Sequence, residues 1–360
     1  MIRTTRSDIR IAVVCLSPYS GGMEIDAANL PAKLAKFNLF SILVCRKDTW
    51  LEEHAVELCT SVYPLKMHGK TSISASFKLK KLWRKLGVNC IIFFGSSEMP
   101  TLLMSLSDSV EHFIVRHGTT KSTSKKDFFH RFTWSKVTAH WCISKHIESN
   151  VRSIFPIGKS RVFTSYISIE PILDKISCAR DLKLDDETFE LVHVGRLENG
   201  KGQDDAIRAV SILRDRGIPA ELTIIGDGHE ASSLKKLAVQ LSISEHIHFW
   251  GRVDSPYEHF DKFHSFLFPS HGEGLGNAFI EALASGMHCL SYSNTVFTEL
   301  RMIGFNFYAV DNSNIMGLAS TLGNIWHSKT EKPLSNISLA RSVFTLKNEL
   351  SPLLHELHLQ

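Results

Sequence analysis

Short apolar runs alternate with longer amphipathic patterns from one end of the chain to the other. The first run, residues 9–16, is followed by a helical pattern that continues through Leu34. A later run, residues 189–194, precedes another helical pattern. Strands that alternate with helices in this way form parallel sheets with helices on both faces. The pattern therefore predicts an α/β protein built on parallel sheets.

This alternation lapses once, between about residues 165 and 187. Pro171 and a polar mixture occupy this interval, and the acidic residues 185–187 close it before the next apolar run. A chain of 360 residues also exceeds a single typical domain, so two hydrophobic cores are expected. The sequence predicts a first domain at 1–168, a linker at 169–187, a second domain at 188–338 and a closing helix at 339–360.

The composition is that of an ordinary globular chain, with 43% hydrophobic and 22% charged residues. The apolar run at 11–16 is too short for a membrane span or a signal peptide and is followed by Pro18, so the protein is expected to remain in the cytoplasm. Seven scattered cysteines without CxxC spacing indicate neither a disulfide framework nor a zinc site. They are interpreted as small core residues in a reducing compartment.

Positive charge is concentrated in the first half of the chain. Residues 1–170 hold 24 Lys and Arg against 13 Asp and Glu, a net +11, whereas the remainder has a net −7. The basic half suggests an anionic partner, either an acceptor molecule or a membrane surface. Two stretches contribute most, a basic amphipathic pattern at 77–86 and a mixture of basic and aromatic residues at 121–136. The first is typical of any helix packed on a sheet, and the aromatic residues of the second fit a lipid interface, sugar stacking or a core.

Two glutamates flank a glycine-rich turn near the C-terminal third of the chain. Glu273 and Glu281 are separated by Gly274, Leu275, Gly276 and Asn277 and by the start of a helical pattern. Bare backbone amides at a helix start favour anionic oxygens, and the carboxylates accept hydrogen bonds from hydroxyl groups. A molecule with both phosphate and hydroxyl groups, such as a sugar nucleotide, fits this combination. The alternative is a solvent-facing helix, because short motifs also occur by chance.

A second element upstream strengthens the first interpretation. Arg196 and Lys201 flank the turn at 195–202, between the apolar run 189–194 and the helical pattern after it. The planar fork of arginine and the point charge of lysine together suit a diphosphate without a metal ion. The chain also lacks an Asp-x-Asp triplet, so metal dependence is not expected.

With these motifs in this order, the chain resembles the retaining GT-B glycosyltransferases of family 4, the glycogen-synthase-like and mannosyltransferase-like group. The similarity covers about residues 190–310 and includes the 225–228 and 248–251 segments between the two motifs. It implies a GT-B fold of two Rossmann-like domains, with the nucleotide sugar bound mainly by the second domain and the acceptor by the first. In the first half, Gly21 and Gly22 match a glycine pair near the diphosphate, and His117 matches a histidine near the transferred sugar.

The resemblance also implies a role for each matching residue. Arg196 and Lys201 would stabilise the departing diphosphate, and Glu281 would bind the ribose. Glu273 would hold hydroxyl groups of the donor sugar together with the amides of Gly274, Leu275, Gly276 and Asn277. The base would lie near Gly251, Arg252 and Val253. The catalytic group is thus expected to be His117, Arg196, Lys201 and Glu273, with no cofactor and no metal.

The function implied is transfer of a hexose from a nucleotide diphosphate sugar, UDP before GDP, with retained configuration. The acceptor would be an anionic glycan or glycolipid of lipopolysaccharide or other bacterial surface polysaccharide, reached in the cytoplasm or at the inner membrane face, with no role for nucleic acid. Alternatives are a sugar-nucleotide epimerase of the same fold and a non-catalytic glycan-binding relative. The chain departs from the family pattern at 164–168, which lacks an Asn-Gly turn, and at 294–299, which lacks a glycine pair before its glutamate.

Overall fold

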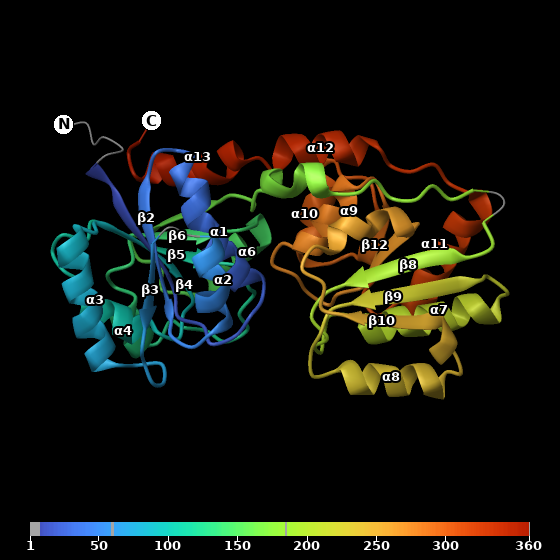
Figure 1. The fold of residues 1–360 in the computed structure, drawn as a ribbon, viewed down its shortest axis with the longest axis horizontal. Coiled ribbons are helices and arrows are strands. Elements are labelled where there is room, and N and C mark those ends of the chain that lie inside the picture. Colours follow the sequence, from blue (N-terminus) through green and yellow to red (C-terminus); the bar gives the residue numbers. More distant parts are fainter. Residues whose placement is uncertain (1–7, 59–60, 184–185, 360) are drawn as a thin grey trace. The chain divides into compact units, whose positions relative to one another are not determined.

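The computed structural model describes residues 8–58, 61–183 and 186–359, which form two compact units (Figure 1). The first unit comprises Met1–Ile167 with Leu346–Gln360, and the second comprises Ser168–Thr345. Each unit contains one parallel sheet, of seven strands in the first and six in the second. The predicted α/β class with two parallel sheets is confirmed.

The first unit alternates strands and helices as the apolar pattern predicts. Its elements are β1 (Arg10–Cys15), α1 (Gly22–Ala35), β2 (Phe40–Arg46), α2 (Trp50–Leu58), β3 (Val62–Leu65), α3 (Ile73–Leu86), β4 (Cys90–Phe94), α4 (Met99–Ser105), β5 (His112–His117), α5 (Phe128–Thr133), β6 (Ala139–Cys142), α6 (Lys145–Ile154), β7 (Arg161–Thr164) and α13 (Leu346–Glu356). The strand order is β3-β2-β1-β4-β5-β6-β7. Strand β4 is buried throughout, as expected for a central parallel strand covered on both faces.

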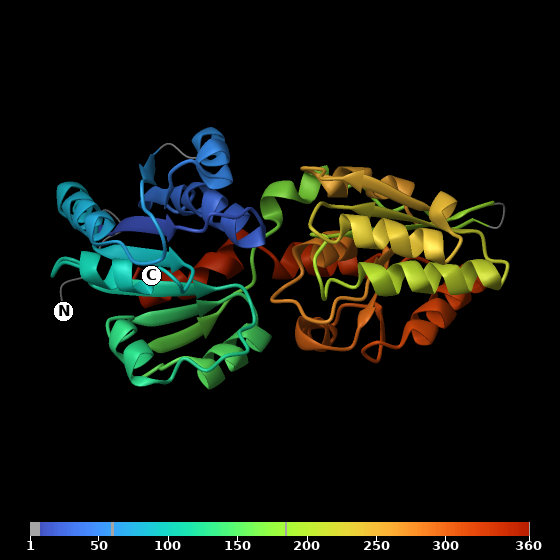
Figure 2. The ribbon, with the colours of Figure 1, turned by 90° about the horizontal axis from the view of Figure 1, so that it is seen from below.

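The second unit repeats the plan with a shorter sheet. Its elements are η2 (Glu170–Lys175), β8 (Phe189–Val194), α7 (Gln203–Asp215), β9 (Ala220–Ile225), α8 (Ala231–Gln240), η3 (Ser244–His246), β10 (Ile247–Gly251), η4 (Pro256–Lys262), β11 (Ser265–Phe268), α9 (Asn277–Ala284), β12 (His288–Tyr292), α10 (Thr295–Ile303), β13 (Tyr308–Val310), α11 (Ile315–Ser328) and α12 (Ser335–Val343). Helices α7 and α8 lie side by side, yellow-green and yellow in Figure 2. Apolar residues of α7, α8 and α11 form one core with the sheet.

Each sheet reverses the direction of its strand order once. In the second unit the order is β10-β9-β8-β11-β12-β13, so the chain first moves outward from β8 and then returns to place β11 on its other side. Loops after neighbouring strands diverge at such a switch point, and ligands of open parallel sheets bind there, at the carboxyl ends of the strands. The β8 and β11 loops therefore frame the expected binding site of this unit.

The boundaries of the units differ from those expected from the sequence. The segment expected as a linker, 169–187, begins with η2, and its described residues belong to the second unit. The backbone N–H of Ala179 donates to Ser285 O, and that of Arg180 donates to Phe263 O, both at 3.0 Å. These bonds fix the segment on the second unit because they satisfy its backbone groups there.

The predicted closing helix at 339–360 is two helices. Helix α12 ends at Val343 in the second unit, and α13 begins at Leu346 in the first. Leucines of α13 join the core of the first unit beside strands β1 and β2. One apolar pattern spans both helices, so the break was not visible in it.

Two further expectations need correction. Of the three alternatives for the aromatic residues at 121–136, a core position does not hold for Phe128, Phe129 and Phe132, which are exposed, although it holds for Trp134, which is buried. The interpretation of the cysteines as core residues is wrong for Cys178, which is exposed, while the other described cysteines are buried. Cys59 lies outside the described residues. Of the helices in the described parts of the chain, none has the length and apolar character that a membrane span requires.

Candidate active site

Two loops meet at the switch point of the second sheet. The loop after β8, residues 195–202, carries Arg196 and Lys201, and the loop after β11, residues 269–276, carries Glu273. The N–H of His271 donates to Gly200 O at 2.9 Å and thereby ties the loops together. The spacing of polar residues in the sequence identified both loops, and the fold makes them neighbours.

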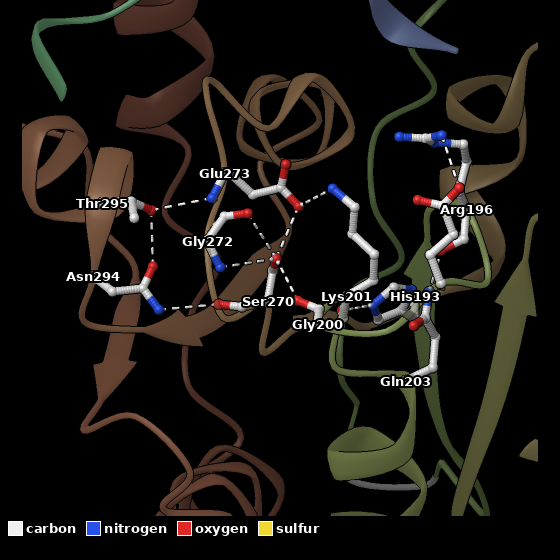
Figure 3. Close-up of polar contacts among 11 residues, drawn as sticks. His193, Arg196, Gly200, Lys201, Gln203, Ser270, Gly272, Glu273, Asn294 and Thr295 are labelled. Atoms are coloured by element: carbon white, nitrogen blue, oxygen red, sulfur yellow. Dashed lines mark hydrogen bonds and ion pairs between the residues drawn. The ribbon is translucent and has the colours of Figure 1, made fainter. Parts of the chain in front are cut away.

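Lys201 and Glu273 form an ion pair across this junction (Figure 3). The distance from Lys201 Nζ to Glu273 Oε1 is 2.7 Å, and the Ser270 hydroxyl donates to the same oxygen at 2.8 Å. The side chains are 23% and 10% exposed, respectively. Because the pair is only partly desolvated, its groups remain accessible to a ligand.

Polar side chains at both ends of the β8 loop hydrogen-bond to its backbone carbonyls. His193 donates from Nε2 to Lys201 O at 3.0 Å, and Gln203 donates from Nε2 to Arg196 O at 2.8 Å. Burial lowers the pKa of His193 to about 4, with the nearby Lys201 ammonium acting in the same direction, so the ring is neutral near pH 7. A neutral ring with one N–H matches its single role as a donor here.

Gly202 lets the two loops approach. Its φ is 78°, and a Cβ atom there would lie 2.1 Å from Pro269 O. Gly226 and Gly228 play the same part on the neighbouring β9 loop, where a Cβ would lie 1.9 Å from Gly195 O and 2.3 Å from Leu197 O, respectively. Side chains at these positions would force the loops apart.

Arg196 is exposed and bonds within its own loop. Its Nη1 lies 2.8 Å from Glu198 Oε1, and no hydrogen bond or ion pair among the described residues joins it to Lys201 or Glu273. An exposed ion pair of this kind is worth little and is readily exchanged for another anion. The two predicted cations therefore lie on one loop but have different partners.

Helix α9 begins directly after the glycine-rich turn. Gly276 has a φ of 73° and precedes Asn277, the first helical residue, and Leu275 is buried. The first N–H groups of an α-helix have no intrahelical acceptor, which makes a helix start of this kind suited to an anion. Gly274 lies in the same turn.

Glu281 lies one turn further along α9 and is half-buried. No hydrogen bond or ion pair of its carboxylate occurs among the described residues. Burial raises the pKa of Glu281 to about 7. Hydroxyl groups of a ligand would compensate this desolvated carboxylate, because they donate hydrogen bonds to it.

The residues at the end of β10 form the neighbouring loop. Gly251 has a φ of 72° with open space around it, and its carbonyl accepts from Gly226 N–H at 2.8 Å. Arg252 Nε lies 3.7 Å from Asp254 Oδ1, and Val253 follows in the chain. These residues are at the carboxyl edge of the same sheet, two strands from β8.

The remaining predicted residues belong to the first unit. Gly21 and Gly22 begin α1 after β1, and His117 ends β5. His117 is buried, and its Nε2 lies 3.0 Å from His140 Nδ1, within a group of rings that includes Trp134 and Phe155. Burial, with repulsion from a protonated His140 as a second cause, holds the pKa of His117 well below its usual value. His117 is therefore neutral near pH 7.

Sequence reasoning missed three residues of this site. Ser270, Asn294 and Thr295 follow strands β11 and β12 and hydrogen-bond with Glu273 and its loop (Figure 3). Their position after buried strands was a usable signal, because carboxyl ends of parallel strands share one edge of a sheet. No metal-binding group of His, Cys, Asp or Glu occurs among residues 8–58, 61–183 and 186–359.

The arrangement is that of a GT-B protein. Over 97% of this chain and 99% of its own, Anabaena HepE in complex with UDP and glucose superposes with a TM-score of 0.82 at 14% identity. The lipopolysaccharide outer core galactosyltransferase WaaB superposes with a TM-score of 0.69 at 17% identity over 97% of this chain and all of its own. At these identities the likeness concerns the fold.

Sequence comparison gives a family match within the second unit of the chain. Residues 175–338 match the family described as glycosyl transferases group 1. The chain is similar to this family over that segment, which is less than half of its length. An uncharacterized glycosyltransferase of Methanocaldococcus jannaschii is 30% identical over 157 residues, which are 41% of this chain and 38% of that protein.

A poly(glycerol-phosphate) alpha-glucosyltransferase of Bacillus subtilis is 26% identical over 146 residues, 39% of this chain and 21% of its own length. The chain thus matches less than half of the length of these relatives. The segment of the family match, residues 175–338, contains both Lys201 and Glu273.

Proposed function

We propose that this protein is a retaining glycosyltransferase that moves a hexose from a nucleotide diphosphate sugar to a glycan or glycolipid acceptor. The observation that carries the proposal is the Lys201–Glu273 ion pair at the switch point, beside a glycine-rich helix start. The pair combines a cation for phosphate with a carboxylate for hydroxyl groups. A UDP-sugar is the favoured donor, because the structurally similar HepE is complexed with UDP and glucose.

In this proposal Lys201 serves both halves of the donor. An ammonium group has three donors, so Lys201 can keep Glu273 and also bind a phosphate oxygen. Arg196 would leave Glu198 and add a second cation as negative charge grows on the leaving group. These two cations do the work of a metal ion, so the reaction is expected to be metal-independent.

Glu281 and Glu273 would divide the hydroxyl groups of the donor. Glu281 would accept from the ribose hydroxyls, and Glu273, with the amides of the 274–277 turn, would hold the hexose. The backbone of residues 251–253 would lie next to the nucleotide base. This division keeps the sugar fixed while the bond to phosphate breaks, which is the stage at which orientation matters most.

Retention requires no protein nucleophile. The bond from the anomeric carbon to the phosphate oxygen breaks, the acceptor oxygen bonds to that carbon on the same face, and the acceptor proton passes to the released phosphate oxygen. The neutral His117 ring and nearby backbone would support the developing positive charge on the sugar. Glu273 binds in this scheme and does not attack.

Surface polysaccharide is the acceptor class we favour. Relatives include a capsular polysaccharide biosynthesis glycosyltransferase CapM of Staphylococcus aureus, 24% identical over 162 residues, and the outer core galactosyltransferase WaaB shares the fold. An anionic acceptor also fits the net +11 of residues 1–170, in which 24 Lys and Arg face 13 Asp and Glu.

An anionic membrane surface is the proposed second partner, reached from the cytoplasm. Helix α4 packs against both α3 and α5. These helices expose Ile73, Phe77, Met104, Phe128, Phe129 and Phe132. Residues 70–86 hold six Lys and Arg and no acid, so charge and apolar groups together match anionic lipid.

Vesicle co-sedimentation tests this partner. The protein is expected to sediment with phosphatidylglycerol vesicles and to be released by salt. Replacing Phe128 and Phe132 by Ser should weaken binding, whereas Met302→Ser, at 83% exposure a match for Phe128 at 85%, should not. Equal binding of all variants, or dimerisation that the Phe variants abolish, would reject a membrane role for this surface.

Thermal unfolding with UDP, GDP, ADP and NAD tests the nucleotide site. A ligand at a hundred times its dissociation constant stabilises by about 2.7 kcal/mol. We expect UDP or GDP to stabilise the wild type and the exposed control Lys236→Ala, but not Lys201→Ala. No response to any nucleotide would favour the non-catalytic glycan-binding relative. Conversion of the UDP-sugar into its epimer without net nucleotide release would favour the epimerase.

A further inference from the structure

Thr295 has an unfavourable backbone conformation next to the candidate site. Its φ is 41°, and it is the only β-branched residue among the non-glycine residues with positive φ in the described parts of the chain. A β-branched side chain crowds the backbone in this region, so the conformation costs free energy and persists only where surrounding contacts impose it. The contacts of Thr295 show what is gained.

The hydroxyl of Thr295 connects two loops. The N–H of Glu273 donates to Thr295 Oγ1 at 3.2 Å, and Oγ1 donates to Asn294 Oδ1 at 2.8 Å (Figure 3). The Thr295 methyl group also lies beside Gly272: a Cβ atom added to Gly272 would be 3.7 Å from Thr295 Cγ2. Thr295 thus fixes the peptide group from which the Glu273 side chain projects.

Asn294 gives up its usual task for the same purpose. It occupies the N-cap of α10, where Asn normally accepts from a backbone N–H of the first turn, yet its side chain makes no cap hydrogen bond. Its amide instead donates to Ser270 O at 3.0 Å and to Asn312 Oδ1 at 2.7 Å. Thr295 and Asn294 therefore both use their side chains to hold the β11 loop, one with a strained backbone and the other without capping its own helix.

We propose that Thr295, supported by Asn294, is a positioning residue that fixes the direction of Glu273 and thereby the grip of the site on the donor's hexose. The proposal rests on the proposed function, since it assigns Glu273 to the sugar. Ser270 constrains the carboxylate at Oε1, and Thr295 constrains the backbone amide of the same residue. With both ends held, the carboxylate needs no reorganisation when the sugar arrives.

The test separates the hydroxyl from the strain at this position. Thr295→Val keeps the shape and loses the hydroxyl, Thr295→Ser keeps the hydroxyl, and Thr295→Gly loses both the hydroxyl and the strain. The quantity measured is the gain in affinity from UDP to UDP-glucose, the sugar increment, by calorimetry. We expect about a tenfold smaller increment for Thr295→Val and Thr295→Gly, the size of one hydrogen bond, with UDP affinity unchanged. Thr295→Ser should retain the increment.

The melting temperature distinguishes a positioning role from a merely structural one, because only a positioning residue can be replaced without loss of stability and still lower the sugar increment. Thr295→Gly should melt at or above the wild-type temperature because its strain is relieved, while its increment is lost. Ser242→Gly is the matched control, since Ser242 also has a positive φ, 58°, but lies outside the site. It should raise the melting temperature and leave the increment unchanged. A Thr295→Gly variant that loses stability and UDP affinity together would overturn the proposal.

Hydrogen exchange of the 270–276 segment tests the positioning without ligand. Thr295→Val should speed exchange of the Glu273 amide, and Thr295→Ser should not. Unchanged exchange in Thr295→Val would overturn the role of Thr295 even if the protein binds UDP-glucose. If Thr295→Val speeds exchange of the Glu273 amide but the wild-type protein binds no nucleotide, the positioning role stands and the proposed function is overturned.

Discussion

At the residue scale, the site depends on a few groups with more than one partner. Glu273 accepts from Lys201 and Ser270 through one oxygen, which leaves its second oxygen for a ligand. The Glu281 carboxylate has no hydrogen bond or ion pair among the described residues, and burial raises its pKa to about 7. One glutamate is thus pre-positioned by its neighbours, and the other is desolvated and uncompensated.

Glu273→Gln is expected to lower kcat by about a hundredfold, the effect of losing one well-placed polar contact in a transition state. UDP affinity should change little, because the carboxylate is assigned to the sugar. Steady-state kinetics with UDP-glucose and a glycan acceptor provide the measurement, with the exposed Glu245→Gln as control. A nearly unchanged rate would argue against contact between Glu273 and the hexose.

The raised pKa of Glu281 predicts that the free energy of unfolding falls as the pH rises. Its ordinary pKa is 4.5, and burial raises the folded value to about 7. Between these values the folded state keeps a proton that the unfolded state has lost, so its contribution is full below pH 4.5 and is lost by about pH 7. Glu281→Gln should remove this part of the melting-temperature profile. A profile identical to that of the wild type would disprove the shift.

At the scale of elements, glycines decide how closely the loops approach. Gly202 lies against Pro269 O of the β11 loop, so the β8 and β11 loops are in contact only because no side chain intervenes. The same holds for Gly226 against Gly195 O between the β9 and β8 loops. These contacts bring the amides and cations of separate strands to one edge of the sheet.

Gly202→Ala should separate the β8 and β11 loops and weaken nucleotide binding as well as stability. A Cβ 2.1 Å from Pro269 O cannot be accommodated without backbone movement. Gly217→Ala is the control, because Gly217 has a similar φ, 77°, with open space around it. The control should lose only about 1 kcal/mol and keep UDP affinity. Calorimetry with UDP and thermal unfolding distinguish the two variants, and equal UDP affinity in both would refute the loop contact.

At the scale of the whole molecule, the end of the chain completes the first unit. Glu349 of α13 is fully buried and bonds Lys33 Nζ at 2.7 Å and Arg116 Nη2 at 2.9 Å. Arg116 also bonds Asp26 at 2.6 Å. Since Arg116 precedes His117 in β5, the last helix supports the strand that carries this histidine.

Glu349→Ala should therefore destabilise the protein strongly. It removes a fully buried carboxylate from Lys33 and Arg116, which then share only Asp26 as a carboxylate partner among the described residues, and a change of this kind costs about 3–5 kcal/mol. Lys145→Ala, which breaks the exposed Lys145–Glu148 pair, should cost less than about 1 kcal/mol. Urea denaturation followed by circular dichroism gives both values, and similar losses would contradict the role of α13.

The sequence by itself determined the architecture of two parallel sheets and predicted the residues of the candidate site. Apolar runs that alternate with helical patterns require parallel sheets, because only such sheets bury strands on both faces. The order of the cationic and glutamate motifs further indicated a sugar-nucleotide site and the family. The strand at 189–194 and the start of α9 after Gly276 follow these expectations closely.

Only the tertiary structure decided the contacts between distant segments. The Lys201–Glu273 pair joins residues 72 positions apart, and Arg116 and Glu349 are 233 apart. The roles of Ser270, Asn294 and Thr295 likewise depend on strand order, which places β11 between β8 and β12. Periodicity describes what one segment buries but not which segment lies beside it, so these contacts follow from the folded sheet alone.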